Sequence, residues 1–157
     1  MSPAPAPTKP IAIYYEHPEW FRPLFAELER RNTPHVLIDA RRHRYDAGAL
    51  NGDSQYSLLF NRMSPSAYTR GNGHGIFYTL NYLAHLERGG TRVVNGHRAF
   101  QHETSKARQL DLLESLGLPF PKARVINHPE QALSAAVGLR YPVVVKPNIG
   151  GSGPTGG

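Results

Sequence analysis

Short apolar runs alternate with helix-like patterns along the first two thirds of the chain. Runs rich in β-branched and aromatic residues predict four strands, at 11–15, 35–38, 56–60 and 92–94. Apolar positions spaced by three or four predict helices over 21–31 and from 76 to a stop at Gly89 and Gly90, whereas the polar stretches 41–55 and 63–75 predict loops. This alternation predicts an α/β fold with a parallel sheet and helices on its faces.

A second unit is predicted to begin near His97. A helix face formed by Ala107, Leu110, Leu113 and Leu116 predicts a helix from about 104 to a stop at Gly117. A strand at 123–126, a short helix at 129–137 and a strand at 143–146 are predicted to follow. The sequence therefore predicts two successive α/β units.

Polar residues follow the predicted strands of the first unit. In parallel sheets, ligands bind outside the carboxyl ends of the strands. Because strand ends lead into loops, and loops are polar, most of these residues need no further explanation. Arg62 is the strongest candidate for a ligand contact because it comes directly after an apolar strand. The residues at these ends are Glu16, His17, Asp39, Asn61, Arg62 and Asn95.

The stretch 141–157 joins an apolar run to a lysine and then to glycines. Lys146 ends the valine run, and Gly150, Gly151, Ser152 and Gly153 follow it. Glycines allow backbone N–H groups to approach a ligand closely, and successive N–H groups form an anion nest. The pattern indicates a phosphate site, although Lys146 could also reach solvent and a G-G-S-G-P-T-G-G segment also resembles a flexible linker.

Lys106 is a second candidate for phosphate binding. It is predicted to lie in the first turn of the helix over 104–116, where a cation opposes the helix dipole. It is also four and seven residues before Leu110 and Leu113, which places it on the apolar side of that helix. A bound phosphate would explain this position, but spacing alone slightly favours a lysine that extends from the helix end to water.

Composition and motif order exclude several other classes of function. The 157 residues include no cysteine, which fits a reducing cytoplasm, and no apolar run approaches the roughly 20 residues of a membrane span. The net charge is +6, but no nucleic-acid motif accompanies the basic residues, and the eight histidines show no metal-ligand spacing. Both the Walker loop and the Rossmann fingerprint are excluded, because Lys146 precedes its glycines and no glycine follows the first strand.

From about residue 10 to 153, the chain resembles the front half of the ATP-grasp carboxylate–amine ligases. The resemblance is greatest to the branch that contains glutathione synthetase and the ribosomal-protein glutamate ligase. Four segments carry it: R-V-V-N-G at 92–96, T-S-K-A-R-Q-L-D-L-L at 104–113, G-L-P-F-P at 117–121, and P-V-V-V-K-P-N-I-G-G-S-G at 142–153. The order and spacing of the two lysines make the match specific.

The resemblance implies a flexible lead at 1–9, a pre-ATP-grasp domain at 10–96 and the start of an ATP-grasp domain at 97–157, truncated at the glycine-rich loop. It implies that Lys106 and Lys146 contact the phosphates of ATP and that the loop over 150–153 closes over them. Arg62 and Asn95 are expected on the substrate side. ATP would convert a small-molecule or peptide carboxylate to an acyl phosphate, which an amine would then attack.

The resemblance also implies that parts of the machinery lie downstream of the glycine loop. The Mg²⁺ ligands, the adenine linker and a late arginine are expected there, so we expect the given chain to be inactive alone as a ligase. A homo-oligomer is implied by resemblance. The alternatives are a non-catalytic nucleotide-binding or partner-docking module, and an unrelated flavodoxin-like binding domain with a linker tail.

Overall fold

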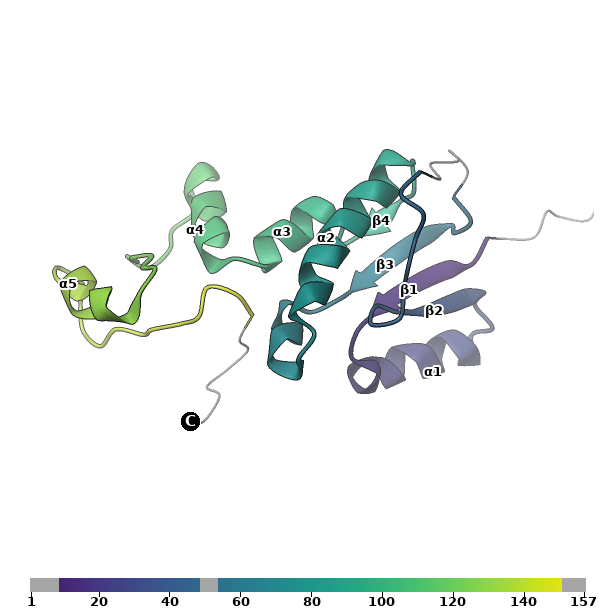
Figure 1. Cartoon of the computed structure of the whole chain (residues 1–157), viewed down its shortest axis with the longest axis horizontal. Coiled ribbons are helices and arrows are strands. Elements are labelled where there is room, and N and C mark those ends of the chain that lie inside the picture. The colour runs from purple at the N-terminus through teal and green to yellow at the C-terminus, as the bar shows by residue number, and fades with distance from the viewer. Residues whose placement is uncertain (1–8, 49–53, 151–157) are drawn as a thin grey trace, which may run out of the picture.

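The computed structural model describes residues 9–48 and 54–150. Its centre is a four-stranded, fully parallel sheet in the order β2-β1-β3-β4. The strands are β1 (Ile11–Tyr15), β2 (His35–Asp39), β3 (Leu58–Arg62) and β4 (Val93–Val94). All four lie where the apolar runs predict strands, so the α/β class and the parallel sheet are confirmed (Figure 1).

Helices cover both faces of the sheet. The 3-10 helix η1 (Pro18–Phe21) leads into α1 (Arg22–Arg30), and α2 (Gly73–Arg88) precedes β4. Neighbouring side chains of a strand point to opposite faces. Tyr14 packs against Tyr82 of α2 with ring centroids 5.3 Å apart, whereas Tyr15 packs against Phe25 of α1 at 5.1 Å. The two helices therefore lie on opposite sides of β1.

The hydrophobic core lies mainly between the sheet and α2. Tyr14 is fully buried there, and its hydroxyl is within 3.1 Å of Thr79 Oγ1. Burial raises the pKa of Tyr14 well above its usual value. The buried residues of this cluster are Ala12, Tyr14, Ala40, Leu59, Met63, Ala67, Ile76, Tyr82, Leu83 and Phe100.

Two helical segments differ from the sequence prediction for 63–75. The 3-10 helix η2 (Pro65–Arg70) occupies the middle of this predicted loop, and α2 begins at Gly73 instead of after Gly75. Ser64 caps η2 by accepting a hydrogen bond from the Ser66 backbone, and Ala67 is fully buried. A side-chain cap and one buried alanine stabilise a turn that shows no apolar periodicity in the sequence.

A short helix after β4 was also missed. Helix α3 (His97–Glu103) contributes Phe100, which is fully buried in the core. Its start depends on Gly96, where a Cβ would lie 1.9 Å from Glu87 Oε1, the atom that accepts a hydrogen bond from the His97 backbone. The two apolar residues among these seven, Ala99 and Phe100, are adjacent and give no helical periodicity, so only the tertiary contact reveals the helix.

The second unit contains helices but no strands within the described residues. Helix α4 (Lys106–Ser115), the 3-10 helix η3 (Pro129–Gln131) and α5 (Ala132–Ala136) agree with the predicted helices. The predicted strands at 123–126 and 143–146 are wrong, because neither segment pairs with another strand. Val144 and Val145 are 75% and 77% exposed. The apolar face predicted for α4 is only half-buried at Ala107, Leu110 and Leu113, and none of its residues is fully buried.

No helix in the described ranges is both long enough and apolar enough to span a lipid bilayer.

Candidate functional site at the carboxyl ends of the strands

The parallel register places the ends of three strands side by side. Tyr15 of β1 is paired with Arg62 of β3, and Phe60 of β3 is paired with Val94 of β4. The residues that follow these strands therefore meet at one edge of the sheet. This edge is where ligands bind in parallel α/β sheets.

Asn61 and Asn95 join the ends of β3 and β4. The Asn61 side-chain amide donates to the Asn95 carbonyl at 3.0 Å, and Asn95 donates back to the Asn61 carbonyl at 3.3 Å. Asn61 Oδ1 also accepts from the Met63 backbone at 3.0 Å. Asn95 has a φ of 55°, a conformation that asparagine tolerates better than most residues. The pair fixes the backbone from which Arg62 extends.

Arg62 lies against aromatic rings. Its guanidinium carbon is 4.8 Å from the centroid of Phe21 and 5.3 Å from that of Phe60. No acidic side chain in the described residues forms an ion pair with it. Arg62 is the last residue of β3, at the carboxyl edge of the sheet, and its contact with a ligand stays a prediction.

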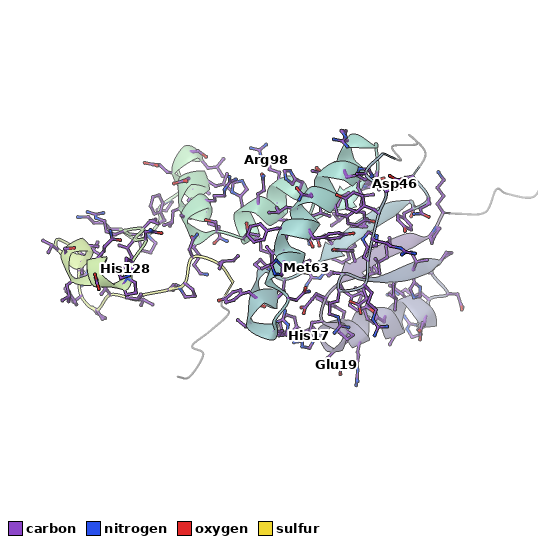
Figure 2. The ribbon with its side chains drawn as sticks, in the orientation of Figure 1. His17, Glu19, Asp46, Met63, Arg98 and His128 are labelled. Carbon is purple, nitrogen blue, oxygen red and sulfur yellow. The ribbon has the colours of Figure 1, made fainter. Side chains whose placement is uncertain are left out.

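A pocket of about 110 Å³ opens at this edge. It combines an aromatic wall, a cation and an anion, and Met63, labelled in Figure 2, marks its position. Glu103, the last residue of α3, supplies the anion. Although Glu103 is an exposed residue overall, desolvation raises the pKa of its carboxyl, and the positive charge of Arg62 partly opposes this. The lining residues are Trp20, Phe21, Asn61, Arg62, Met63, Ser64, Asn95 and Glu103.

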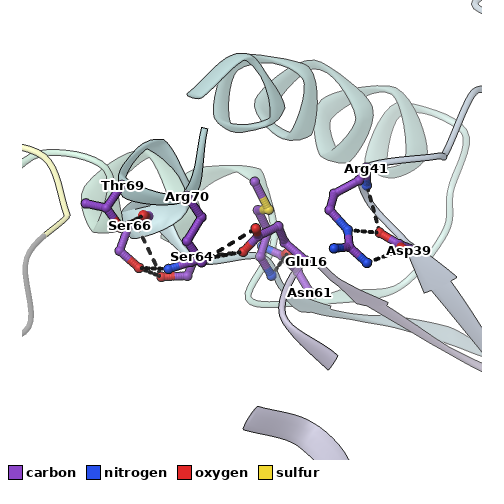
Figure 3. Close-up of polar contacts among 9 residues, drawn as sticks. Glu16, Asp39, Arg41, Asn61, Ser64, Ser66, Thr69 and Arg70 are labelled. Carbon is purple, nitrogen blue, oxygen red and sulfur yellow. Dashed lines mark hydrogen bonds and ion pairs between the residues drawn. The ribbon is translucent and has the colours of Figure 1, made fainter. Parts of the chain in front are cut away.

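A buried ion pair supports the wall of this pocket. Glu16 is only 4% exposed, and its carboxylate accepts from Arg70 at 2.5 to 3.2 Å. Arg70 also donates to Ser66 Oγ at 3.2 Å, as Figure 3 shows, and its guanidinium carbon lies 4.8 Å from the Trp20 ring centroid. Arg70 thus connects β1, η2 and Trp20, so that the aromatic wall is held by several interactions.

Lys106 lies beside the start of the glycine-rich segment. Its Nζ donates a short hydrogen bond to the Gly150 carbonyl, and its backbone N–H donates to the Asn148 carbonyl at 2.9 Å. The Asn148 side-chain oxygen also accepts from the Ala107 backbone at 2.9 Å and from Ser105 Oγ at 3.2 Å. The structure therefore brings together two of the sequence-predicted residues, Lys106 and Gly150, although they are far apart in the chain.

Gly150 also contacts the first unit. It has a φ of +61°, and a Cβ at this position would lie 2.7 Å from Tyr68 Cε1 and 3.1 Å from the Pro65 carbonyl oxygen. Only glycine can therefore bring the chain this close to η2. Gly150 thus lies against η2, and Ser64, at the start of η2, lines the pocket. The glycine-rich segment therefore begins close to the pocket.

Other predicted site residues are not part of this arrangement. Lys146 is exposed, and no side-chain partner for it occurs among the described residues. Gly151, Ser152 and Gly153 lie outside the described residues. Within the described ranges, no three or more His, Asp or Glu side chains come together in a way that could hold a metal ion. This geometry does not test whether Lys106 and Lys146 bind phosphate, and it does not test a magnesium site.

Sequence reasoning missed several residues of the site, and three of them bear most on its chemistry. Trp20 and Glu103 line the pocket, and Asn148 ties the glycine-rich segment to α4. No signal in the sequence singles out Glu103, because α3, the helix that it ends, shows no apolar periodicity.

Solved structures with this fold include several ATP-grasp ligases. An ATP-grasp RimK domain protein from Sphaerobacter thermophilus matches 85% of this chain and 47% of its own, with a TM-score of 0.61 and 20% identity. The ATP-grasp ligase PsnB, solved with a precursor peptide and AMPPNP, matches 87% of this chain and 54% of its own, with a TM-score of 0.53 and 20% identity. The chain thus spans about half of each solved chain.

Sequence comparison gives a shorter match. A tetrahydromethanopterin:alpha-L-glutamate ligase of Methanosarcina acetivorans is 35% identical over 79 residues, which is 50% of this chain and 24% of that protein. No family model matches the chain. The comparisons agree on the fold, which is that of the N-terminal portion of ATP-grasp ligases.

Proposed function

We propose that this chain, whose fold is that of the N-terminal portion of ATP-grasp ligases, is the N-terminal part of an ATP-dependent carboxylate–amine ligase. ATP would transfer its terminal phosphoryl group to a carboxylate, giving an acyl phosphate and ADP. An amine would then attack the acyl carbon, so that the amide forms and phosphate leaves. Residues 10–96 would form the pre-ATP-grasp domain, and residues from 97 would begin the ATP-grasp domain.

The observation that carries this proposal is the contact between Lys106 and Gly150. Lys106 is the first residue of α4, where a cation is unfavourable for the helix dipole, and its ammonium group lies at the entrance to a glycine-rich segment. A phosphate would offer this ammonium a charge-assisted partner in place of a neutral carbonyl. Lys146, four residues before Gly150, would supply a second cation from the exposed side.

The residues present suit the phosphates of ATP better than the metal. Two lysines and glycine-rich backbone provide cationic and N–H donors, whereas the described residues provide no cluster of metal ligands. ATP would supply the phosphoryl group, and Mg²⁺ would neutralise charge on it. This part of the protein would position the phosphates, and the pocket with Arg62 and Asn95 would hold a substrate.

The names of the matched proteins are consistent with this class of reaction. One is named for ligating alpha-L-glutamate, and PsnB was solved with a peptide and with nucleotide. By analogy, the substrates of this chain would be small-molecule or peptide carboxylates and amines. A reaction that consumes ATP fits a cytoplasmic protein.

Calorimetric titration with AMPPNP and Mg²⁺ tests the phosphate assignment. The wild-type chain is expected to bind, and Lys106→Ala and Lys146→Ala are each expected to weaken binding about tenfold or more, because each removes a charge-assisted interaction. Lys122→Ala is the matched control, since Lys122 Nζ also donates to a glycine carbonyl, that of Gly138, at 2.9 Å. Equal affinity in all three variants would contradict the proposal. Binding without ligation in the complete protein would favour the non-catalytic alternative.

A further inference from the structure

Two opposite charges face the same small pocket without neutralising each other. Arg62 and Glu103 both line it, yet no ion pair joins them, and neither side chain has another charged partner in the described part of the chain. The charge of Arg62 does act on the Glu103 carboxyl, so the two groups are near one another. A pair of close but separate charges leaves room for a ligand between them.

Neither charge is neutralised by an ion pair among the described residues. Glu103 is the last residue of α3, where a negative charge opposes the helix dipole. Arg62 follows an apolar strand segment and rests on Phe21 and Phe60 instead of on an acidic side chain. Both residues are better explained by what they would bind.

The pocket has an apolar wall and a small volume. Trp20 stacks on His17 with ring centroids 4.4 Å apart and also lies against Arg70, so its ring is held in place from more than one side. A volume of about 110 Å³ compares with the roughly 150 Å³ of a cavity that holds benzene. The pocket therefore accommodates a molecule of a few heavy atoms, or the head of a longer one.

We propose that this pocket binds the α-amino and α-carboxylate groups of a small amino acid in its zwitterionic form. Arg62 would hold the carboxylate, Glu103 the ammonium group, and Trp20 would cover the apolar part. The inference rests on the proposed function only where it identifies this amino acid as the amine substrate. A ligand that is only an anion would leave the Glu103 carboxylate unpaired and would repel it. A ligand that is only a cation would leave the Arg62 guanidinium unpaired and would repel it.

Fluorescence of Trp20 reports binding directly, because it is the only tryptophan in the chain. L-Alanine is compared with propionate, which lacks the ammonium group, and with ethylamine, which lacks the carboxylate. Each is titrated with and without AMPPNP and Mg²⁺. L-Alanine is expected to change the Trp20 emission with an affinity at least about tenfold greater than either half-molecule, because only it pairs with both charges.

Two variants separate the two charges. Glu103→Gln is expected to reduce the affinity for L-alanine to about that for propionate, and Arg62→Gln is expected to reduce it to about that for ethylamine. Arg98→Gln, an exposed arginine on α3 labelled in Figure 2, and Glu114→Gln, an exposed glutamate on α4, are matched controls expected to leave the affinity unchanged. Circular dichroism establishes whether each variant is folded. If Arg62→Gln does not fold, the result rests on Glu103→Gln, because Glu103 is exposed and its substitution is not expected to unfold the chain.

The outcomes distinguish this inference from the proposed function. If L-alanine causes no change in Trp20 emission, or if propionate binds equally well and Glu103→Gln has no effect, the inference is overturned even when AMPPNP binds. If L-alanine binds as described while AMPPNP does not, the amino acid site is supported and the nucleotide proposal fails.

Discussion

Two apolar runs of this chain that contain β-branched residues, 11–15 and 143–146, occupy opposite environments. In β1, Ala12, Ile13 and Tyr14 are almost completely buried, and the strand is paired on both sides, with β2 and with β3. At 143–146 a similar run has no regular secondary structure and is largely exposed, and it pairs with no strand of the described chain. In Figure 1, α5, the helix that precedes this run, lies well away from the sheet.

The difference shows what turns an apolar run into a strand. β-Branched residues favour a pleated, half-buried surface, but that preference depends on neighbouring strands and on packing against the faces. Strand β1 has two parallel neighbours and helices on both faces, whereas 143–146 has no neighbouring strand within residues 9–48 and 54–150. The contact of Gly150 with η2 and the cap from Asn148 instead hold the end of this segment against α4 and the first unit.

The largest expected effect comes from opening a cavity in the sheet region. Leu59→Ala removes most of a fully buried side chain from β3 and is expected to lower the free energy of unfolding by about 2–5 kcal/mol. Val144→Ala, at an exposed position in the second unit, is expected to change it by less than about 0.5 kcal/mol. Urea denaturation followed by circular dichroism measures both. Similar losses in the two variants would mean that 143–146 is packed in solution and that the contrast is wrong.

A smaller effect is expected from the buried ion pair beneath the pocket. Glu16→Gln leaves the Arg70 guanidinium, whose side chain is 26% exposed, without its charged partner, and is expected to cost about 1–3 kcal/mol. The control is Glu19→Gln, because Glu19 pairs with Arg22 at the surface, where such pairs contribute about 0–1 kcal/mol. Thermal unfolding compares the two variants. A Glu16→Gln protein as stable as the control would show that Arg70 finds other partners.

The smallest effect is expected where the two regions meet. Asn148→Ala removes the side-chain acceptor of the Ala107 N–H and is expected to weaken the first turn of α4 by about 1 kcal/mol. Hydrogen exchange of the Ala107 amide should then accelerate by about fivefold. Asn127→Ala is the control, since the Asn127 side chain makes no hydrogen bond among the described residues. Unchanged exchange at Ala107 would show that the segment is not docked on α4 in solution.

Local pattern was sufficient to predict much of the fold. The four strands of the sheet, α1, α2 and α4 each carry a regular apolar spacing or a terminal signal such as Gly89 or Gly117. Helix α3 and η2 lack such spacing, because one or two buried residues and a capping contact are enough to stabilise them. The predicted strands at 123–126 and 143–146 failed for the opposite reason, since they have the apolar pattern of a strand but no strand of the described part of the chain pairs with them.

The residues of the candidate site also divide into those that the sequence predicted and those that only the structure revealed. The chain by itself determined that Arg62 and Asn95 would follow parallel strands, and that Lys106 and Lys146 would be cations near helix and glycine signals. Only the tertiary structure decided that Lys106 contacts Gly150 and that Glu103 and Trp20 share a pocket with Arg62. The physical reason is that spacing along a chain fixes which face a residue occupies, whereas packing between elements fixes which faces meet.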